Sequence, residues 1–382
     1  MVQRLNCLEV KAALLVEGVR AAPEALAEVG TKFKEQNHGL FGWDFEDHVG
    51  IALPDDFFLP DGTVVQFRKN SKSPYEIGLN GRKDLVLSSG REEVCRVRWI
   101  PRPAYYARKT QNGNSMVKIG QIGGEDCLFF CYQNYCSFFS KHEQCLFCNL
   151  VSTSDRYDSV LKKKDTEDIG EVAAAAFAEG TVRHVLLTGG CFNHQKEIDM
   201  VSDILKSVRS HTGLDRVPGT VLPSPAKGPD DARRYHETGI KAIGFSMEIW
   251  DERLYRAICP GKSSSTSHDE FVRGIETAVG AFGEGNVYAV FVMGLEPRET
   301  FLQGVREITA RGANVVPFVW SPNPGSKLEG HRAPTGQWYV DTALEAAEIV
   351  YESKVPPGTE NHCFRCDGNS LLHDALRLKG IE

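Results

Sequence analysis

The sequence predicts an α/β protein whose main body is a partial (β/α)6 TIM barrel, joined to a smaller N-terminal α+β domain and a short C-terminal extension that contains cysteines. Three observations support this prediction. The chain repeats the order strand, loop, helix from about residue 116 onward, the residues before that point form short extended segments separated by turns, and a pair of cysteines lies near the end. The predicted boundaries are 1–112, 113–355 and 356–382.

The N-terminal domain is predicted from helical and extended patterns. Apolar residues recur at helical spacing over 8–18, and a second short helix is expected over 22–34. Turn signals such as Pro60-Asp61-Gly62 and Asn80-Gly81 separate the extended segments that follow. These segments are HVGIAL (48–53), TVVQFR (63–68), YEIGLN (75–80), LVLSS (85–89) and VCRVRW (94–99). Residues 103–115 are interpreted as a connector.

The barrel is predicted from the alternation of strands with helices. Strands are expected over 126–134, 182–188, 219–223, 241–247, 286–293 and 314–320, and helices over 166–179, 197–211, 230–238, 269–282, 298–311 and 340–353. This order indicates right-handed βαβ units and a parallel sheet, about three-quarters of an eight-unit barrel. Reactive residues of such barrels lie at the carboxyl ends of the strands. The serine-rich run 263–267 is predicted to be a loop.

Composition and charge exclude some functions. The chain of 382 residues is 41% hydrophobic and 25% charged, as is ordinary for a globular protein. Its formal net charge of -7 argues against binding to the phosphate backbone of nucleic acids. Because no secretory signal and no apolar run of membrane-spanning length is evident, we expect a cytoplasmic protein without a membrane partner.

The chain has 11 cysteines, which is many for a protein of that compartment. Disulfides are rare there, so clustered cysteines more often bind metal or take part in catalysis. The clusters are Cys127, Cys131, Cys136, Cys145 and Cys148, and the CxxC pair Cys363 and Cys366. The isolated residues Cys7, Cys95, Cys191 and Cys259 are first interpreted as small buried hydrophobes.

Three of these cysteines, Cys136, Cys145 and Cys148, directly follow the first barrel strand with the spacing C-x8-C-x2-C, and Phe147 precedes the last of them. Three thiolates on one loop can bind three irons of a [4Fe–4S] cluster and leave the fourth iron open. A structural zinc site would normally use four protein ligands. The triplet therefore predicts an iron–sulfur cluster with one position open to another ligand.

Other candidate residues lie at the ends of later strands. Glycines there allow a ligand to approach the backbone closely, and a buried carboxylate needs a cationic or hydroxyl-rich partner. An ordinary turn or a surface glutamate is the alternative explanation at each position. The candidates are Thr188, Gly189 and Gly190 after the second strand, Ser246 and Glu248 after the fourth, Gly294 and Glu296 after the fifth, and Asn323 after the sixth.

With these motifs, residues 116–355 resemble the radical S-adenosylmethionine (radical SAM) superfamily. The segment from Cys145 to Cys148 matches the second half of the family's CxxxCxxC motif, in which an aromatic residue precedes the last cysteine. Thr188, Gly189 and Gly190 resemble its GGE motif, with Cys191 at the position of the glutamate. Ser246 and Glu248 match positions that contact SAM, and Gly294 and Glu296 lie in a stretch similar to the one that lines the adenine. The text GFSMEIWDERLYRAICPGK resembles the biotin-synthase-like branch.

The resemblance implies that SAM binds the open iron and that one electron cleaves it to methionine and a 5′-deoxyadenosyl radical, which abstracts hydrogen from a small organic substrate. It also implies oxygen sensitivity and an electron donor of the flavodoxin or ferredoxin type. C-terminal cysteines of the family often bind an auxiliary iron–sulfur cluster, which implicates Cys363 and Cys366. Cys191, near the SAM methionine, is the predicted catalytic residue, as a hydrogen donor to the substrate radical or as a ligand of a second cluster.

Several alternatives remain open. Cys131 is the rival of Cys136 as the first cluster ligand, because the spacing is longer than the usual one. Cys127 and Cys131 share a strand face and could bind a second metal or a substrate sulfur. Sulfur insertion with an auxiliary cluster, methylation and rearrangement are alternative reactions. A non-catalytic protein stabilised by zinc between the two CxxC pairs is the alternative outside enzymes.

Overall fold

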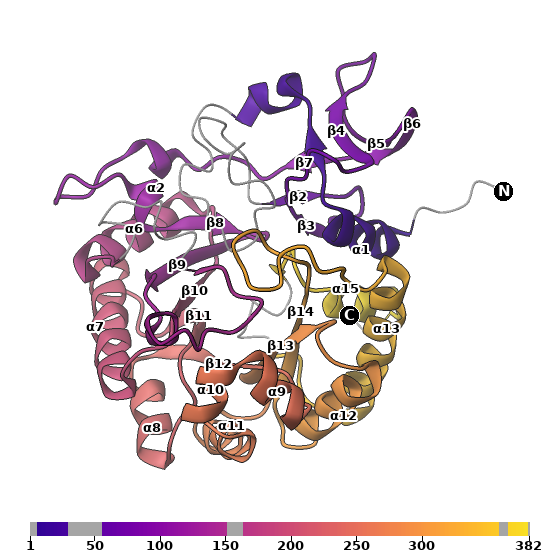
Figure 1. Ribbon diagram of the computed structural model, residues 1–382. Coiled ribbons are helices and arrows are strands. Elements are labelled where there is room, and N and C mark those ends of the chain that lie inside the picture. Colours follow the sequence, from indigo (N-terminus) through magenta and orange to yellow (C-terminus); the bar gives the residue numbers. More distant parts are fainter. Residues whose placement is uncertain (1–5, 30–55, 151–162, 359–365, 381–382) are drawn as a thin grey trace.

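The computed structural model describes residues 6–29, 56–150, 163–358 and 366–380 (Figure 1). A curled sheet of seven strands lies at the centre, in the order β14-β13-β12-β11-β10-β9-β8. Its six parallel strands are β9 (Cys127–Gln133), β10 (His184–Gly189), β11 (Val217–Leu222), β12 (Ile240–Glu248), β13 (Val287–Met293) and β14 (Asn314–Val319). The predicted partial barrel is therefore confirmed.

One edge of this sheet differs from the prediction. Strand β8 (Gln121–Gly123) pairs antiparallel with β9, and the short helices η4 (Ala104–Ala107) and α2 (Met116–Ile119) precede it. The predicted connector thus continues into a seventh, antiparallel strand. This strand covers the edge of β9, which would otherwise expose unpaired backbone groups.

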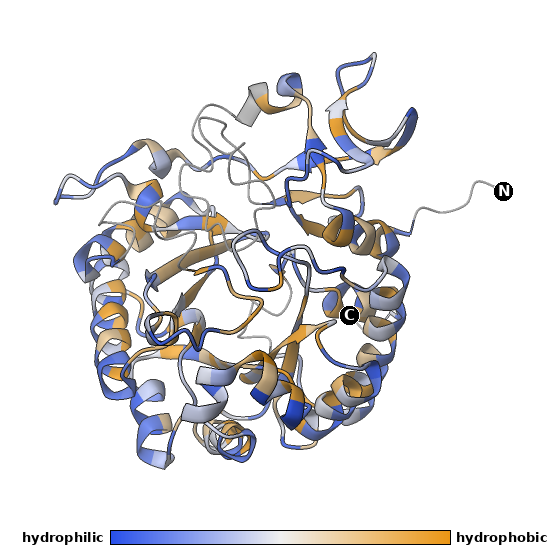
Figure 2. Cartoon of the chain, in the orientation of Figure 1, coloured by the Kyte–Doolittle hydropathy of each residue, from blue (hydrophilic) through white to orange (hydrophobic). Residues whose placement is uncertain are grey.

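Helices surround the sheet as a ring (Figure 1). They are α6 (Thr166–Glu179), α7 (His194–Thr212), α8 (Pro229–Glu237), α11 (His268–Phe282), α12 (Arg298–Thr309) and α13 (Gly336–Ser353), close to the predicted positions. Their outer sides are largely hydrophilic, whereas the strands are mostly hydrophobic (Figure 2). Every residue of β13 is buried. The main core thus lies between the sheet and the helical ring.

The predicted loop at the serine-rich run 263–267 is wrong for residues 263–265. Residues 252–265 form two short helices, α9 (Glu252–Ile258) and α10 (Pro260–Ser265). Pro260 starts α10 because its fixed φ suits the first turn of a helix. The hydroxyls of Ser263, Ser264 and Ser265 each donate to the carbonyl three residues earlier, at 2.9–3.0 Å, so the serines lie within the helical turn. This segment contributes a charged residue to the cavity described below.

The N-terminal part forms helix α1 (Cys7–Glu17) and two small sheets. One sheet has β1 (Arg20–Ala21), β4 (Tyr75–Leu79), β5 (Leu85–Ser89) and β6 (Glu92–Arg96), and the other has β2 (Asp56–Phe58), β3 (Val64–Gln66) and β7 (Arg98–Trp99). The predicted strand 94–99 is thus divided between both sheets. The predicted strand 48–53 lies outside the described residues. The described part of the second predicted helix is the 3-10 helix η1 (Pro23–Val29).

Helix α1 connects the N-terminal part to the barrel. Leu14 is buried in the core of the small sheets, whereas Leu8 and Leu15 are buried in the main core. The buried Arg68 adds polar contacts, because its guanidinium donates to the Leu15 carbonyl at 2.7 Å and to the Val319 carbonyl, at the end of β14, at 2.9 Å. The predicted domain boundaries remain predictions.

The C-terminal extension ends in helix α15 (Leu372–Leu378), which packs against α13. The ammonium of Lys11 on α1 lies 2.6 Å from the Asp374 carboxylate, and both side chains are buried. Among the described residues, no helix combines the length and the apolar character that a membrane crossing requires.

Candidate functional site

A cavity of about 990 Å³ extends through the interior of the partial barrel. Eleven of the predicted site residues lie on its wall: Cys366, and ten others near one edge of the sheet. The ten are Cys136, Cys145, Phe147, Cys148, Thr188, Gly189, Gly190, Cys191, Ser246 and Glu248, near the carboxyl ends of β9, β10 and β12. Parallel strands place their carboxyl ends at one edge, so residues far apart in the sequence meet there.

The segment that carries the cysteine triplet is held by backbone hydrogen bonds on several sides. Helix α3 (Ser137–Ser140) occupies the first part of the long interval between Cys136 and Cys145. The amide of Ser137 donates to the Cys191 carbonyl at 2.8 Å, and the amide of Leu146 donates to the Ile258 carbonyl at 2.9 Å. The lengthened spacing therefore forms a defined loop that is tied to β10 and α9.

Helix α10 supports the same loop. The amide of Gly261 donates to the Glu143 carbonyl at 2.9 Å. A Cβ atom at Gly261 would come within 2.7 Å of this carbonyl and would also overlap the ring of Phe138. Only glycine permits this contact between α10 and the cysteine loop.

Burial and mutual contact set the chemistry of the thiols. Cys136 is buried with Phe138 in an apolar cluster against which Cys148 and Cys191 pack. The thiol of Cys191 hydrogen-bonds to Cys136, which lowers the pKa of Cys136 and, together with burial, raises the pKa of Cys191 well above its usual value. Burial and the nearby Cys145 raise the pKa of Cys148 to about 12.

The rival ligand Cys131 has other partners. Its thiol hydrogen-bonds to the side-chain oxygen of Asn134 and lies 3.8 Å from the Gln133 carbonyl. The ammonium of Lys164 donates to the Cys131 carbonyl at 2.6 Å. The structure thus groups Cys136, rather than Cys131, with Cys148.

The glycines after β10 pack closely against the end of β9 and the segment that follows it. A Cβ atom at Gly190 would overlap the Tyr135 carbonyl and lie 2.9 Å from the Cys136 Cβ, and one at Gly189 would lie 2.9 Å from the Tyr132 ring. We expected these glycines to admit a ligand, and both line the cavity. Their closest contacts, however, are to the end of β9 and the segment that leads to Cys136. They let the cysteine loop lie directly beside β10.

A buried ion pair lies near the end of β12. The ammonium of Lys262, on α10, lies 2.5 Å from the Glu248 carboxylate and 2.9 Å from the Ser246 carbonyl. Burial alone would lower the pKa of Lys262, but Glu248 and the neighbouring thiols raise it well above its usual value. Glu248 has a φ of 72°, a conformation that is uncommon for residues with side chains and is often found at functional sites.

A second buried carboxylate lines the cavity beyond Cys191. Glu197 lies in the first turn of α7 and accepts a hydrogen bond from the Ser224 amide at 2.9 Å. Burial raises the pKa of Glu197, although the bond from Ser224 opposes this shift. The pair of Glu248 and Lys262 and the carboxylate of Glu197 are thus buried charges on the cavity wall near the cysteine loop.

The two predicted residues after the fifth barrel strand do not line the cavity. The carboxylate of Glu296 accepts the backbone amides of Trp250 and Asp251 at 2.8 and 2.9 Å, and so holds the start of α9. Gly294 has a φ of 105°, and a Cβ atom there would overlap the hydroxyl of Tyr339. Both residues thus contact neighbouring parts of the chain.

The predicted C-terminal pair is only partly described. Cys363 lies outside the described residues, whereas Cys366 is buried and lies next to Cys127. Asn323, predicted over the mouth of the barrel, is buried but does not line the cavity.

Sequence reasoning missed Lys262, Glu197 and His184. Lys262 was missed because α10, the helix that carries it, has no apolar pattern in the sequence. Glu197 looked like an ordinary residue of a first helical turn. Cys259, expected to be a simple buried hydrophobe, is fully buried but also hydrogen-bonds to Cys145.

Known proteins share sequence similarity with this chain. The model of the radical SAM superfamily matches residues 131–308. A bacteriochlorophyllide c C-7(1)-hydroxylase of Chlorobaculum limnaeum is 24% identical over 262 residues, which are 63% of this chain and 64% of that protein. This chain therefore spans less than two thirds of that relative.

Solved structures of low similarity include three enzymes or maturases. Methylornithine synthase (PylB) has a TM-score of 0.45 at 17% identity, over 60% of this chain and 64% of its own. The FeFe-hydrogenase maturase HydG of Carboxydothermus hydrogenoformans has a TM-score of 0.46 at 17% identity, and the match covers 60% of this chain and 51% of HydG. Coproporphyrinogen III oxidase (HemN) of Escherichia coli has a TM-score of 0.41 at 14% identity, and the match covers 62% of this chain and 55% of HemN.

The sequence match, together with the cysteine triplet at the carboxyl end of the first barrel strand, agrees with the family expected from the motifs. Residues 131–308 therefore match the radical SAM superfamily domain.

Proposed function

We propose that this protein reductively cleaves SAM at a [4Fe–4S] cluster and abstracts hydrogen from a small organic substrate. The observation that carries the proposal is the meeting of the cysteine triplet, the Thr188–Gly190 segment and the pair of Glu248 and Lys262 in one cavity. The bound cluster would supply the electron that splits SAM into methionine and a 5′-deoxyadenosyl radical. The chain supplies ligands, charge and a dry space.

The residues fit such a cluster by their chemistry. Cys136, Cys145 and Cys148 offer three thiols, the ligand that iron–sulfur clusters prefer. The hydrogen bond from Cys191 lowers the pKa of Cys136, which favours the thiolate that binds iron. Burial raises the pKa of Cys148, so iron binding would have to displace the proton of this thiol.

Charge complementarity supports SAM binding at the same place. The amino acid part of SAM carries one ammonium and one carboxylate group. Glu248 and Lys262 present the two opposite charges side by side, so Glu248 would accept from the amino group and Lys262 would donate to the carboxylate. Thr188, Gly189 and Gly190 would add backbone contacts from the end of β10. Adenine contacts by Gly294 and Glu296 remain a prediction without support from the cavity.

The remaining cavity suits an organic substrate with apolar parts. Inward-facing side chains of the strands form its central wall, and they exclude water from the reacting groups. These residues are Phe129, Leu186, Tyr288, Val290, Val316 and Phe318. We propose a donor of the flavodoxin or ferredoxin type as the electron source and a cytoplasmic location.

Two observations bear on the reaction subtype. Hydroxylation, the activity in the name of the similar Chlorobaculum protein, is the first subtype that we propose to test. Sulfur insertion requires an auxiliary cluster as a sulfur source. The described ligands around Cys366 lie within 4.8 Å of one another, and this spacing suits one ion better than a cluster.

The decisive experiment is anaerobic reconstitution with iron and sulfide, followed by reduction with dithionite in the presence of SAM. We expect about four irons per chain from the triplet and formation of 5′-deoxyadenosine and methionine. Cys145→Ala and Cys148→Ala should abolish both products, whereas Cys95→Ala, in the core of the N-terminal sheets, should retain them. Cleavage that persists in the triplet variants, or zinc bound there instead of iron, would contradict the proposal.

A further inference from the structure

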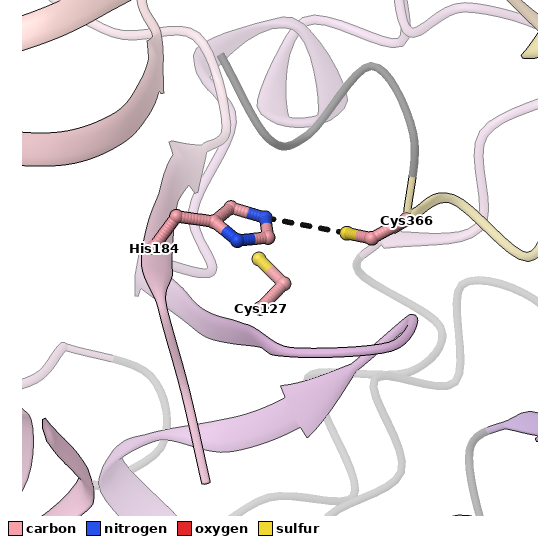
Figure 3. A group of neighbouring side chains, drawn as sticks. All are labelled: Cys127, His184 and Cys366. Atoms are coloured by element: carbon pink, nitrogen blue, oxygen red, sulfur yellow. Dashed lines mark hydrogen bonds between the residues drawn. The ribbon is translucent and has the colours of Figure 1, made fainter. Parts of the chain in front are cut away.

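Three ligand-type side chains meet at the opposite end of the barrel strands. Cys127 is the first residue of β9, His184 is the first residue of β10, and the two are register partners in the sheet. Cys366 joins them from the C-terminal extension (Figure 3). All three are buried, and their sulfur and nitrogen ligand atoms lie within 4.8 Å of one another.

The histidine is oriented as metal-binding histidines are. Its Nδ1 lies 3.1 Å from a carboxylate oxygen of Asp126, and the other oxygen of Asp126 lies 3.5 Å from the Arg183 guanidinium. The two atoms lie within ion-pair distance without hydrogen-bond geometry; a carboxylate near Nδ1 favours the tautomer with the proton there, which leaves a lone pair on Nε2. This Nε2 lies 3.2 Å from the sulfur of Cys366 (Figure 3).

Close packing brings Cys366 to this position. A Cβ atom at Gly124 would lie 2.9 Å from the Cys366 sulfur and would overlap its carbonyl, and Gly124 has a φ of 65°. Glycine is therefore required at this turn between β8 and β9. The sulfur of Cys366 is held against the sheet by this backbone contact.

The cluster is separate from the cysteine triplet. Cys127 begins β9, whereas Cys136 follows the end of that strand. A strand of this length spans about 20 Å. Cys127 and Cys366 nevertheless line the same cavity, at its other end. What this second group of side chains binds does not depend on the proposed function.

We propose that Cys127, His184 and Cys366 bind a single zinc ion; among the described residues no other ligand side chain joins these three, so the fourth position opens toward the cavity that Cys127 and Cys366 line. Thiolate and imidazole ligands select zinc among the common divalent metals. Tetrahedral zinc would place a sulfur and an imidazole nitrogen about 3.5 Å apart, close to the 3.2 Å between Cys366 and His184. A cubane cluster would need its ligands farther apart, because each cysteine binds a different iron.

Zinc binding to these three residues conserves protons and charge. Zinc displaces the thiol protons of Cys127 and Cys366, and Nε2 of His184 binds through its lone pair without losing a proton. Two thiolates neutralise the charge of the ion. A water or a heteroatom of a molecule in the cavity completes the coordination. The ion would also tie the C-terminal extension to β9 and β10.

The test measures metal content and ligation in the full-length protein, reconstituted with zinc after the triplet has been loaded with iron. We expect one tightly bound zinc per chain, and X-ray absorption at the zinc edge should show two sulfurs and an imidazole nitrogen. Cys127→Ser and Cys366→Ser should lower zinc affinity at least tenfold, and Asp126→Asn should lower it about 10- to 100-fold. Cys95→Ser, in the core of the N-terminal sheets, is the matched control that should retain zinc.

Several outcomes would overturn the site. Wild-type protein that is folded but binds no zinc, a zinc spectrum without imidazole, or full zinc retention in Cys127→Ser and Cys366→Ser would each do so. A third sulfur ligand would contradict the open fourth position, and about eight irons per chain would show a second cluster instead. Because the absorption spectrum is measured on the wild type, a variant that fails to fold does not decide the result.

Discussion

The ammonium of Lys262 lies 2.5 Å from the carboxylate of Glu248, and the two side chains are only 10% and 11% exposed. The residues are on different elements, α10 and the end of β12, and each neutralises a charge that would be costly to bury alone. Because the pair lines the cavity beside the cysteine loop, it links the stability of the barrel to the proposed binding of SAM.

Lys262→Met should destabilise the protein by about 3 to 5 kcal/mol, because it leaves the Glu248 carboxylate buried without a partner. The double variant Glu248→Gln, Lys262→Met should lose clearly less than the sum of the two single variants. Urea unfolding of the protein without metal measures both effects. Calorimetry on the reconstituted protein should also show weaker SAM binding in each single variant.

Arg233, in an exposed i, i+4 contact with Glu237, is the control for this prediction. Both of these side chains are 64% exposed, so Arg233→Met should change the unfolding free energy by less than about 0.5 kcal/mol. Additive effects of the Glu248 and Lys262 changes would show that the pair is not coupled.

The choice between Cys136 and Cys131 can be tested directly. Cys136→Ala should lose the absorbance of the iron–sulfur cluster, because Cys136 packs with Cys148 in the cluster of thiols. Cys131→Ala should retain it, since the Cys131 thiol hydrogen-bonds to Asn134. Iron content and visible spectra after anaerobic reconstitution decide between them. The opposite pattern would assign the ligand to Cys131.

Cys191→Ala separates two roles of that thiol. If Cys191 supplies hydrogen to a substrate radical, the variant should still bind iron and cleave SAM but form no product. Its contact with Cys136 also predicts a second effect, because loss of the hydrogen bond removes the cause of the lowered pKa of Cys136. Cluster assembly as a function of pH should therefore shift to higher pH. Unchanged assembly and unchanged product formation would remove Cys191 from both roles.

The buried Glu197 should make the stability of the folded protein depend on pH. Burial raises the pKa of Glu197 in the folded protein above its unfolded value. The folded state then binds more protons than the unfolded state, so this stabilising contribution is present below the unfolded pKa and is lost as the pH rises through the folded pKa. Glu197→Gln should retain more stability than the wild type from pH 5 upward. Thermal unfolding from pH 4 to 8 measures this difference, and parallel curves would contradict it.

Arg68 should be essential for the junction between the N-terminal part and the barrel. Its guanidinium donates to the carbonyls of Leu15 and Val319 and to the side chains of Ser321 and Asn369. Arg68→Met leaves these buried acceptors unpaired, and we expect a loss of about 3 kcal/mol or more in unfolding free energy.

Arg96→Met is the matched control for Arg68. Arg96 is 63% exposed and pairs with Asp84 at the surface, so the change should cost less than about 1 kcal/mol. Equal effects of the two substitutions on thermal unfolding would show that the junction does not depend on Arg68.

Much of the barrel could be predicted from the sequence. The six parallel strands and six of the surrounding helices are visible because burial imposes local patterns, continuous apolar runs for strands and a period of 3.6 residues for helices. The cysteine triplet is likewise local, and its three members lie on one loop next to β9. Such features need no knowledge of distant contacts.

Other elements could not be predicted, for identifiable reasons. The serine-rich α10 lacks an apolar pattern, and its serines bond within the helix itself. The segment 94–99 reads as one strand, but its halves pair with different partners, β5 and β2. Glu296 resembles a ligand at a strand end, but its carboxylate binds the backbone of Trp250 and Asp251.

The sequence by itself determined that this protein has a strand–helix repeat and a thiol triplet after the first barrel strand. Only the tertiary structure decided which charges and ligands meet. His184 and Cys366 are 182 residues apart, and Lys262 faces Glu248 from another element. Local sequence patterns indicate how each segment is buried. They do not indicate which distant side chain contacts it, because such contacts form only when the whole chain folds.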